Sequence, residues 1–444
     1  GQTLSTRADL IGEEMAADLS ELQDRLPPFA GAQARRTIEE ELGRPLEALF
    51  TRFDDTPAAA ASIAQVHHAV TTEGREVAVK VLRPGIEAAF SRDLDLFYWV
   101  AALAERTQPD LRRLRPVEVV RTFAEGVRLE MDLRLEAAAA SELGENFQDD
   151  PTFRVPKVDW LRTARRVLTL DLIGGIAIDE RQALIDAGHD LDDILAKAAA
   201  AFFAQVFRDG FFHADLHPGN LFVDPDGNIV AVDFGIMGRL DRKTRCWLAE
   251  MLLAFLNGDY RRAAEVHFEA GYVAADKSLD AFTQACRSIA EPILERPLNE
   301  ISLARLLAQL FQVTKAFEMR TQPQLLLLQK TMLVIEGVGR NLNPETNVWH
   351  LARPLIKDWM QDNTSPEARV RDATAEALES LERLPGLIRD ASASAALIAE
   401  GGLRLHPDTI RALKANNPAR KAALWPLWAA IALIALVALA ALLW

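Results

Sequence analysis

The sequence lacks several features that mark common classes of protein. Only two of its 444 residues are cysteines, Cys246 and Cys286, too few for a disulfide framework or a cysteine-ligated zinc site. A reducing, cytoplasmic compartment fits this composition. Basic residues are in deficit, with 50 Lys and Arg against 64 Asp and Glu, whereas binding of DNA or RNA needs clustered cations. We therefore expect no nucleic-acid partner.

A targeting signal is missing from the first residues. Neither the basic start nor the apolar core of a signal peptide occurs in GQTLSTRADLIGEEM. Because the sequence opens on Gly1 rather than on methionine, we expect the natural chain to begin upstream of it.

Long apolar runs are also missing, except for one at the end. Residues 425–444, WPLWAAIALIALVALAALLW, carry no charge, and as a helix they would measure about 30 Å, which spans a bilayer core. A buried core helix is rarely apolar on every face, and tryptophans at both ends suit membrane interfaces. Basic residues between positions 411 and 421 precede the run. We predict a transmembrane helix, with the preceding domain on the cytoplasmic side of the membrane.

The remaining sequence patterns predict an α+β protein with two lobes. Short strand patterns occur in SIAQVHHAV and EVAVKVL, which TTEGR joins as a hairpin, and again in RVPKVDWL and RRVLTLDLI. Residues 86–150 have helical spacing, and helices dominate after about residue 190. The predicted parts are a helical extension (1–50), a strand-containing lobe (51–172), a helical lobe (173–364), an amphipathic linker (365–424) and the transmembrane helix. The linker fits equally a helix on the bilayer surface and one packed on the domain.

Chemistry is concentrated in the stretch FFHADLHPGNLFV. Its Asp215 and Asn220 fit the catalytic-loop pattern of protein kinases, H-x-D-L-x-x-x-N. Asp233 lies 13 residues after Asn220 and opens an Asp-Phe-Gly motif, and upstream the strand pattern VAVK ends in Lys80. Three motifs in this order predict a site for phosphoryl transfer.

Each residue type suits a step of that chemistry. Asp233 and Asn220 offer the hard oxygen ligands that Mg²⁺ prefers. Lys80 would hold the α- and β-phosphates of ATP. Asp215 would orient or deprotonate the nucleophile, whether that is an alcohol or water.

The alternating residues His213, Asp215 and His217 allow a second interpretation as a zinc site. Alternating ligands can share one face of a strand, but the adjoining residues HPGN predict a turn. We therefore expect both histidines to hydrogen-bond the loop rather than to bind metal.

Two parts of a protein kinase are not present in the sequence. An alanine-rich stretch replaces the glycine-rich loop ahead of Lys80, and alanine restricts the close backbone approach that glycine permits. Its position still favours a nucleotide-binding loop over a spacer. No Ala-Pro-Glu comes after the Asp-Phe-Gly motif, which argues against a protein substrate. The candidate nucleotide-binding stretch comprises Ala58, Ala59, Ala60, Ala61, Ser62, Ile63, Ala64 and Gln65.

Acidic partners for Lys80 lie in the stretch RLEMDLRLEAAAASEL. Asp132 and Glu136 are four residues apart, where like charges on one helix face repel unless a cation lies between them. Lys80 or Mg²⁺ could be that cation. The alternative is a solvated acidic face paired with Arg128 and Arg134.

Together these residues resemble the UbiB family of atypical kinases, also called the ABC1 family, over nearly the whole chain. GQTLSTRADL is similar to the end of the family's K-x-G-Q motif and the residues after it, AAAS to its alanine-rich loop, and EMDLRLEA to its E-x-D motif. HADLHPGN and VDFG are similar to its catalytic and metal motifs, and LLLLQKTMLVIEGVGRNLNP to a late helix.

This resemblance implies a kinase-like fold with a helical extension over the active site. It implies ATP binding by the alanine-rich loop and Lys80, with Glu136 pairing the lysine. The extension obstructs peptide substrates in the family and favours ATP hydrolysis or action on a small lipid. The remaining implied roles are proton acceptor for Asp215, Mg²⁺ ligands for Asn220 and Asp233, and membership of the extension for Gln2, Glu130 and Asp132.

The resemblance leads to two candidate functions. The first is a membrane-anchored kinase or ATPase that uses Mg-ATP in ubiquinone biosynthesis, with a polyprenyl phenol or quinone lipid, the membrane and other enzymes of that biosynthesis as partners. The second is a nucleotide-binding pseudoenzyme that presents polyprenyl lipids to other enzymes, and the retained Asp215 weighs against it. A flavin monooxygenase is not expected, because no G-x-G-x-x-G occurs after a strand pattern.

Overall fold

The computed structural model describes most of the chain between residues 27 and 364. Several sequence predictions lie outside the described residues: Gln2 in the extension, Ser62, the linker 365–424 and the transmembrane helix 425–444. Among the helices that are described, none combines the length and apolarity needed to cross a bilayer. The described ranges are 27–61, 63–107, 116–294, 312–314, 316–319, 323–345 and 348–364.

A five-stranded antiparallel sheet forms the first lobe. Its centre is the predicted hairpin of β3 (Ala64–Thr71) and β4 (Glu76–Leu82). β4 also pairs with β6 (Val167–Asp171), while β3 pairs with β1 (Phe50–Phe53) and the short β2 (Ala59–Ala60). The hairpin prediction and the strand in RRVLTLDLI are confirmed.

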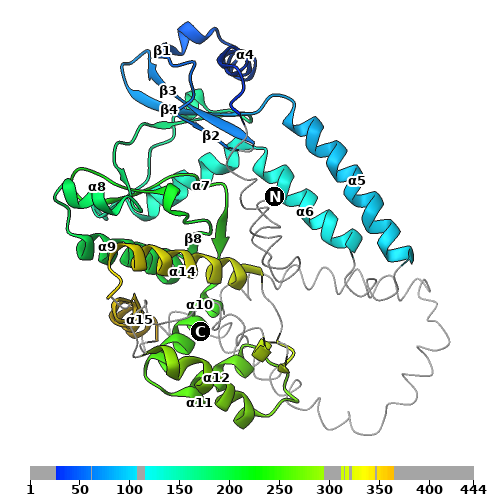
Figure 1. Ribbon diagram of the computed structural model, residues 1–444, viewed down its shortest axis with the longest axis vertical. Helices are drawn as coiled ribbons and strands as arrows, with labels where there is room; N and C mark the ends of the chain where they lie inside the picture. The colour runs from blue at the N-terminus through cyan, green and yellow to red at the C-terminus, as the bar shows by residue number, and fades with distance from the viewer. Residues whose placement is uncertain are drawn as a thin grey trace, which may run out of the picture. The chain divides into compact units, whose positions relative to one another are not determined.

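Alternation along β4 decides the direction in which Lys80 points. Val77, Val79 and Val81 are fully buried and pack against α4 (Gly31–Leu42), which covers one face of the sheet (Figure 1). Because successive residues of a strand point to opposite faces, Lys80 projects from the face that α4 does not cover.

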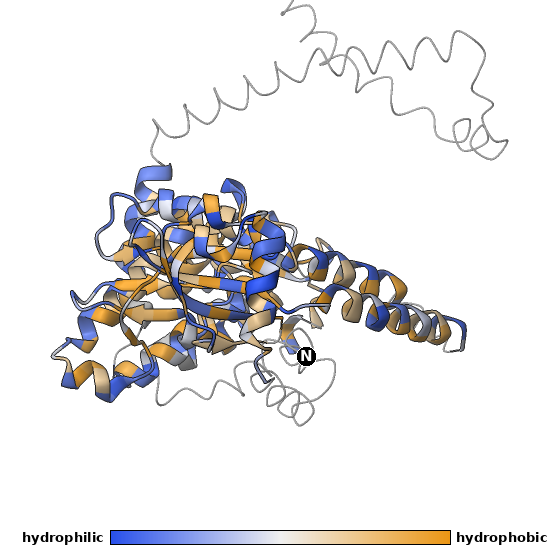
Figure 2. Ribbon diagram, turned by 90° about the horizontal axis from the view of Figure 1, so that it is seen from above, coloured by the Kyte–Doolittle hydropathy of each residue, from blue (hydrophilic) through white to orange (hydrophobic). Residues whose placement is uncertain are grey.

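The stretch with helical spacing after residue 86 is helical, as predicted, and three helices lie among its described residues. They are α5 (Ile86–Thr107), α6 (Pro116–Glu130) and α7 (Leu133–Asn146). α5 and α6 lie side by side and extend away from the sheet, as Figures 1 and 2 both show. α7 contacts β6, and Asp132 caps its first turn by accepting a hydrogen bond from the backbone N–H of Arg134.

The strand predicted in RVPKVDWL, residues 154–161, is wrong. In place of a continuous strand, this stretch holds the end of β5 (Phe153–Arg154), a single antiparallel bridge from Val158 to Leu170 of β6, and the start of the 3-10 helix η3 (Trp160–Arg162). Pro156 has no N–H to donate to a neighbouring strand. The carboxylate of Asp159 accepts a backbone N–H of η3, which starts a helical turn instead.

The second lobe is mainly helical, and its short strands carry the catalytic motifs. Two small sheets have the strand orders β5-β10-β9-β7 and β11-β8. Their strands are β7 (Ile176–Ala177), β8 (Phe211–His213), β9 (Leu221–Val223), β10 (Ile229–Ala231) and β11 (Met237–Arg239). The helices are α8 (Arg181–Asp186), α9 (Leu191–Phe203), α10 (Arg242–Leu256), α11 (Tyr260–Glu269), α12 (Leu279–Leu294), α14 (Pro323–Leu342) and α15 (Val348–Thr364).

One apolar core fixes the catalytic strands to the helices behind them. It includes Phe202 of α9, Phe212 of β8, and Leu328 and Ile335 of α14. α9 and α14 lie side by side (Figure 1). The chain therefore has the predicted kinase-like α+β fold, with strands early and helices late.

Candidate active site

Lys80 and Glu136 form an ion pair on the face of the first sheet opposite α4. Nζ of Lys80 lies 2.8 Å from Oε1 and 3.0 Å from Oε2 of Glu136, which α7 supplies. The same ammonium lies 3.1 Å from Oδ1 of Asp233 in the second lobe. The side chain of Lys80 is 17% exposed and that of Glu136 is 7% exposed. The structure thus contains the pair that the family resemblance implies, and adds Asp233 as a third member.

Mutual attraction favours the charged forms of Lys80 and Asp233, whereas burial raises the pKa of the Glu136 carboxyl. Burial alone would lower the pKa of the Lys80 ammonium, but the negative charges of Glu136 and Asp233 outweigh it and raise that pKa. The charge of Lys80 in turn lowers the pKa of the Asp233 carboxyl. At neutral pH, Asp233 is therefore an anionic oxygen ligand and Lys80 a cation.

The Asp-Phe-Gly turn aims Asp233 at the lysine. Asp233 has a φ of 61°, in the left-handed region that aspartate tolerates better than most residues. The next residue, Phe234, is 1% exposed, and its ring centroid lies 5.7 Å from that of His213. Burial of the phenylalanine anchors the turn while the carboxylate beside it remains in contact with Lys80.

His213 is a structural member of the catalytic loop. Its buried ring accepts the backbone N–H of Asp215 at Nδ1 and donates from Nε2 to the carbonyl oxygen of Val232, at 3.1 Å in both cases. His217 caps the next turn by accepting the backbone N–H of Gly219 at Nδ1. Both ring nitrogens of His213 are occupied, so the zinc interpretation is wrong for this residue.

Asn220 and Asp233 lie at the ends of paired strands. β9 begins directly after Asn220 and pairs with β10, and the backbone N–H of Val232 donates to the carbonyl of Asn220 at 2.9 Å. The side-chain Nδ2 of Asn220 donates to the carbonyl of Asp215 at 3.0 Å, and its Oδ1 is an oxygen of the type that could hold a metal. Mg²⁺ commonly takes one or two protein oxygens and completes its shell with phosphate and water. The donor set of Asn220 and Asp233 fits Mg²⁺, and the described residues hold no larger cluster of His, Cys, Asp and Glu that suits a metal.

Asp215 has an ionic partner that the motifs did not indicate. Nζ of Lys330, on α14, lies 2.7 Å from Oδ1 of Asp215. These residues are 115 positions apart, so no local spacing relates them. The sequence signal was only the likeness of LLLLQKTMLVIEGVGRNLNP to a family helix, and it gave Lys330 no role.

Glu130 lies close enough to the site for the charges of its residues to change the pKa of the Glu130 carboxyl. It ends α6 and keeps contact with solvent. Partial desolvation, together with the charges of Asp233 and Asp215, raises the pKa of its carboxyl. The structure therefore brings Glu130 to the same cluster of acidic groups as the two catalytic-motif aspartates.

Asp132 faces a different environment. Its carboxylate binds the guanidinium of Arg134 at 2.9 and 2.6 Å and caps α7 from outside the helix. Glu136 binds Lys80 instead. The hypothesis that Lys80 lies between Asp132 and Glu136 is therefore wrong, because an N-cap residue does not share the helical face four residues on. For Asp132, the alternative partner Arg134 is the one observed.

The alanine-rich stretch is part of a tight hairpin. β2 pairs with the start of β3, and the backbone N–H of Ala61 donates to the carbonyl of Ala64 at 2.8 Å. Ile63 and Ala64 pack into an apolar cluster. The buried side-chain amide of Gln65 is held by the backbone of Phe29. Among the described residues of this stretch, the side chains offer phosphates no accessible polar group, so backbone N–H groups are the donors that they have available.

An open groove of about 490 Å³ runs beside the catalytic loop. Its lining consists of Asp179, Pro218, Val334, Gly337, Val338 and Asn341. Pro218 belongs to the catalytic loop. Positions 334, 337 and 341 recur at helical spacing from Lys330, so the groove runs along the face of α14 that carries this lysine.

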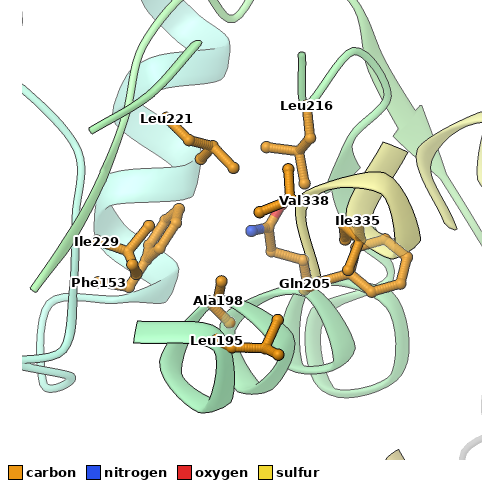
Figure 3. Close-up of a pocket in the computed structure, with 11 residues that line it drawn as sticks. Phe153, Leu195, Ala198, Gln205, Leu216, Leu221, Ile229, Ile335 and Val338 are labelled. Carbon is orange, nitrogen blue, oxygen red and sulfur yellow. The ribbon is translucent and has the colours of Figure 1, made fainter. Parts of the chain in front are cut away.

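A second cavity lies behind the loop and is not a nucleotide site (Figure 3). Its volume of about 10 Å³ leaves room for about one water molecule, and its walls are mostly apolar. Gln205, from the π-helical segment η4 (Ala204–Asp209), lines it and accepts the backbone N–H of His213 at 2.9 Å. This cavity marks the place where η4 supports the catalytic loop.

Two family models match the sequence. One, described as an ABC1 atypical kinase-like domain, covers residues 21–267, and the other, a UbiB helical domain, covers residues 286–347. The first contains Asp215 and the second contains Lys330. Fold and site together define a kinase-like protein in which the two matched regions meet at this ion pair.

Named relatives agree with this class. The chain is 44% identical over 398 residues to "Probable protein kinase UbiB" of Marinobacter nauticus, which is 88% of this chain and 73% of that protein. The protein of the same name from Azotobacter vinelandii is 45% identical over 395 residues, again 88% and 73%. The chain therefore belongs to the UbiB family of ABC1 atypical kinases, and the resemblance inferred from its motifs is confirmed.

A solved structure shares the fold. The complex of Rv3197 with erythromycin from Mycobacterium tuberculosis matches with a TM-score of 0.59 and 26% sequence identity. The match covers 81% of this chain and 92% of that one.

Substitution of Lys80 tests the buried pair. Lys80→Met should lower the free energy of unfolding by about 3 kcal/mol, because Glu136 would stay buried without its partner. Adding Glu136→Gln should recover part of this loss, giving a coupling energy of at least about 1 kcal/mol in a double-mutant cycle. Urea denaturation monitored by circular dichroism measures all four proteins.

The control is Lys277→Met. Lys277 pairs with Glu318, whose side chain is 72% exposed, so its loss should change stability by less than about 1 kcal/mol. Strict additivity of the Lys80 and Glu136 substitutions would contradict the coupling that we ascribe to the pair.

Proposed function

We propose that this chain is a membrane-anchored atypical kinase or ATPase that uses Mg-ATP in support of ubiquinone biosynthesis. One observation carries the proposal: residues of three separate motifs are connected. Lys80 binds Asp233, which follows β10. β10 pairs with β9, which begins directly after Asn220, and the side chain of Asn220 binds the backbone of Asp215. Phosphoryl transfer needs this set of groups around a triphosphate.

We also propose that the two lobes divide between residues 172 and 173, in the segment that joins β6 to β7.

Each group then has one task. Mg²⁺, when bound by Asn220 and Asp233, would neutralise charge on the phosphates. Lys80 exchanges part of its pairing with Asp233 for the α- and β-phosphates. Asp215 accepts the proton of the nucleophile as the new phosphorus–oxygen bond forms.

The acceptor that we propose is the phenol head of a polyprenyl lipid, whose O–H supplies the proton that Asp215 accepts, with water as the competing acceptor. β11 leads through Asp241, the N-cap, straight into α10, and no Ala-Pro-Glu platform for peptides intervenes. The groove beside the catalytic loop has a largely apolar lining, which suits an isoprenoid chain.

Membrane attachment has two kinds of support. Leu96, Trp99 and Leu103 recur at helical spacing on α5 and are exposed by 55%, 63% and 44%. Figure 2 shows apolar residues along the pair of helices that includes α5. The apolar run 425–444 provides an anchor of bilayer length. We propose that the protein lies on the cytoplasmic side of the inner membrane, near the other enzymes of ubiquinone biosynthesis.

The second candidate function is a nucleotide-binding protein that presents polyprenyl lipids without chemistry of its own. The largely apolar groove beside the catalytic loop favours it, because such a lining suits an isoprenoid chain whether or not phosphoryl transfer follows. Catalytic turnover distinguishes the two candidates.

Hydrolysis by the Asp233→Asn variant tests the leading proposal. The full chain in liposomes should hydrolyse ATP in a Mg²⁺-dependent manner, and a polyprenyl phenol should stimulate it. Because Asp233 supplies the anionic metal ligand, the variant should lose at least about 100-fold in turnover. Phosphate release measures both proteins. Wild-type nucleotide binding without turnover would favour the presenting function.

Filling the groove tests the lipid acceptor. A Cβ at Gly337 meets no atom within 4 Å, so Gly337→Phe fits on α14 and projects a ring into the groove. We expect it to reduce stimulation by polyprenyl phenol at least about fivefold while basal hydrolysis stays within about twofold. Gly337→Ala is the matched control, since it also replaces the helix-weakening glycine but leaves the groove open. Full stimulation in Gly337→Phe would place the lipid elsewhere.

A further inference from the structure

Lys330 brings the helical domain into the active site. Its ammonium binds Asp215 at 2.7 Å, and the two side chains are 35% and 26% exposed. An ammonium has three N–H donors, and this bond uses one of them. Lys330 can therefore hold Asp215 and still donate to a second anion.

The helix that carries Lys330 is fixed against the catalytic loop. Leu328, Thr331 and Ile335, on either side of it in sequence, are at most 5% exposed. The hydroxyl of Thr331 lies within hydrogen-bond distance, 3.5 Å, of the carbonyl oxygen of His213. The backbone at residue 330 is thus held by packing, while the long lysine side chain keeps solvent access at its tip.

Cations are scarce where the γ-phosphate must lie. The catalytic loop from His213 to Asn220 contains no Lys or Arg. Lys80 is already shared between the carboxylates of Glu136 and Asp233. A γ-phosphate brought next to the anionic Asp215 would be repelled unless a further cation lay between them. Among the described residues, Lys330 is the cation that contacts Asp215.

We propose that Lys330 is a catalytic residue that binds the γ-phosphate of ATP and positions Asp215 toward the nucleophile. This inference rests on the proposed function. In the transfer step, the bond from the γ-phosphorus to the β,γ-bridging oxygen breaks, and its electron pair leaves with ADP. The nucleophile oxygen bonds to phosphorus, and its proton passes to Asp215. Lys330 stays protonated throughout and stabilises the charge on the transferring oxygens.

Discrimination between ATP and ADP tests this role separately from turnover. We compare the full-length wild type with Lys330→Gln, Lys330→Arg and the surface control Lys277→Gln. Equilibrium binding of a non-hydrolysable ATP analogue and of ADP, both with Mg²⁺, is measured beside kcat and KM for hydrolysis. Thermal unfolding confirms that each variant folds.

Lys330→Gln should bind the ATP analogue at least about tenfold more weakly and ADP within about twofold of wild type, because only ATP has the γ-phosphate. Its kcat should fall about 100-fold, and Lys330→Arg should restore part of both losses. Lys277→Gln should match wild type throughout.

Other results overturn the inference. Equal weakening of ATP and ADP binding would mean a general role in the fold of the site. A higher kcat in Lys330→Gln would mean that the pair with Asp215 is inhibitory. If the wild type binds ATP but shows no Mg²⁺-dependent turnover, the proposed function fails, and the binding comparison still decides the role of Lys330.

Discussion

The site depends on the ion pair between Lys80 and Glu136. Both side chains are largely removed from water, and unpaired charges there would be strongly destabilising. The surrounding structure positions both side chains. The valines of β4 pack under α4, so Lys80 points to the opposite face of the sheet. Asp132 is the N-cap of α7, the helix that carries Glu136. Asp233, in a left-handed turn anchored by a buried phenylalanine, then joins the pair from the second lobe. One interaction thereby links the sheet, the helix and the metal motif.

Sequence patterns predicted the parts of this arrangement that depend on local order. The hairpin containing Lys80 is predicted by alternation and a turn signal, and the catalytic loop by the fixed spacing of Asp215 and Asn220. Spacing made Glu136 one of two acidic candidates for Lys80, and the resemblance to a known family selected it over Asp132. In each case the feature is predicted either from residues close together in the sequence or from a motif shared with a known family.

Other features depend on which of two local structures is more stable, or on contacts between residues far apart in the sequence. The spacing of neighbouring residues does not reveal either. Asp132 and Glu136 have helical spacing, but the helix begins only at Leu133, so the two carboxylates have different partners. RVPKVDWL has strand-forming residues, but a proline and a capping aspartate favour a short helical turn. Lys330 meets Asp215 only because the apolar faces of α9 and α14 pack together. That contact is tertiary, and a single sequence gave no sign of it.

We propose above all that Lys80, Asn220 and Asp233 surround a metal–nucleotide complex. The most direct measurement is a crystal structure of the protein with Mn²⁺ and a non-hydrolysable ATP analogue, with the metal located by anomalous scattering. We predict an anomalous peak within bonding distance of Oδ1 of Asn220 and a carboxylate oxygen of Asp233, with the phosphates beside Lys80. A metal bound away from these two oxygens, or a nucleotide bound away from Lys80, would contradict this proposal.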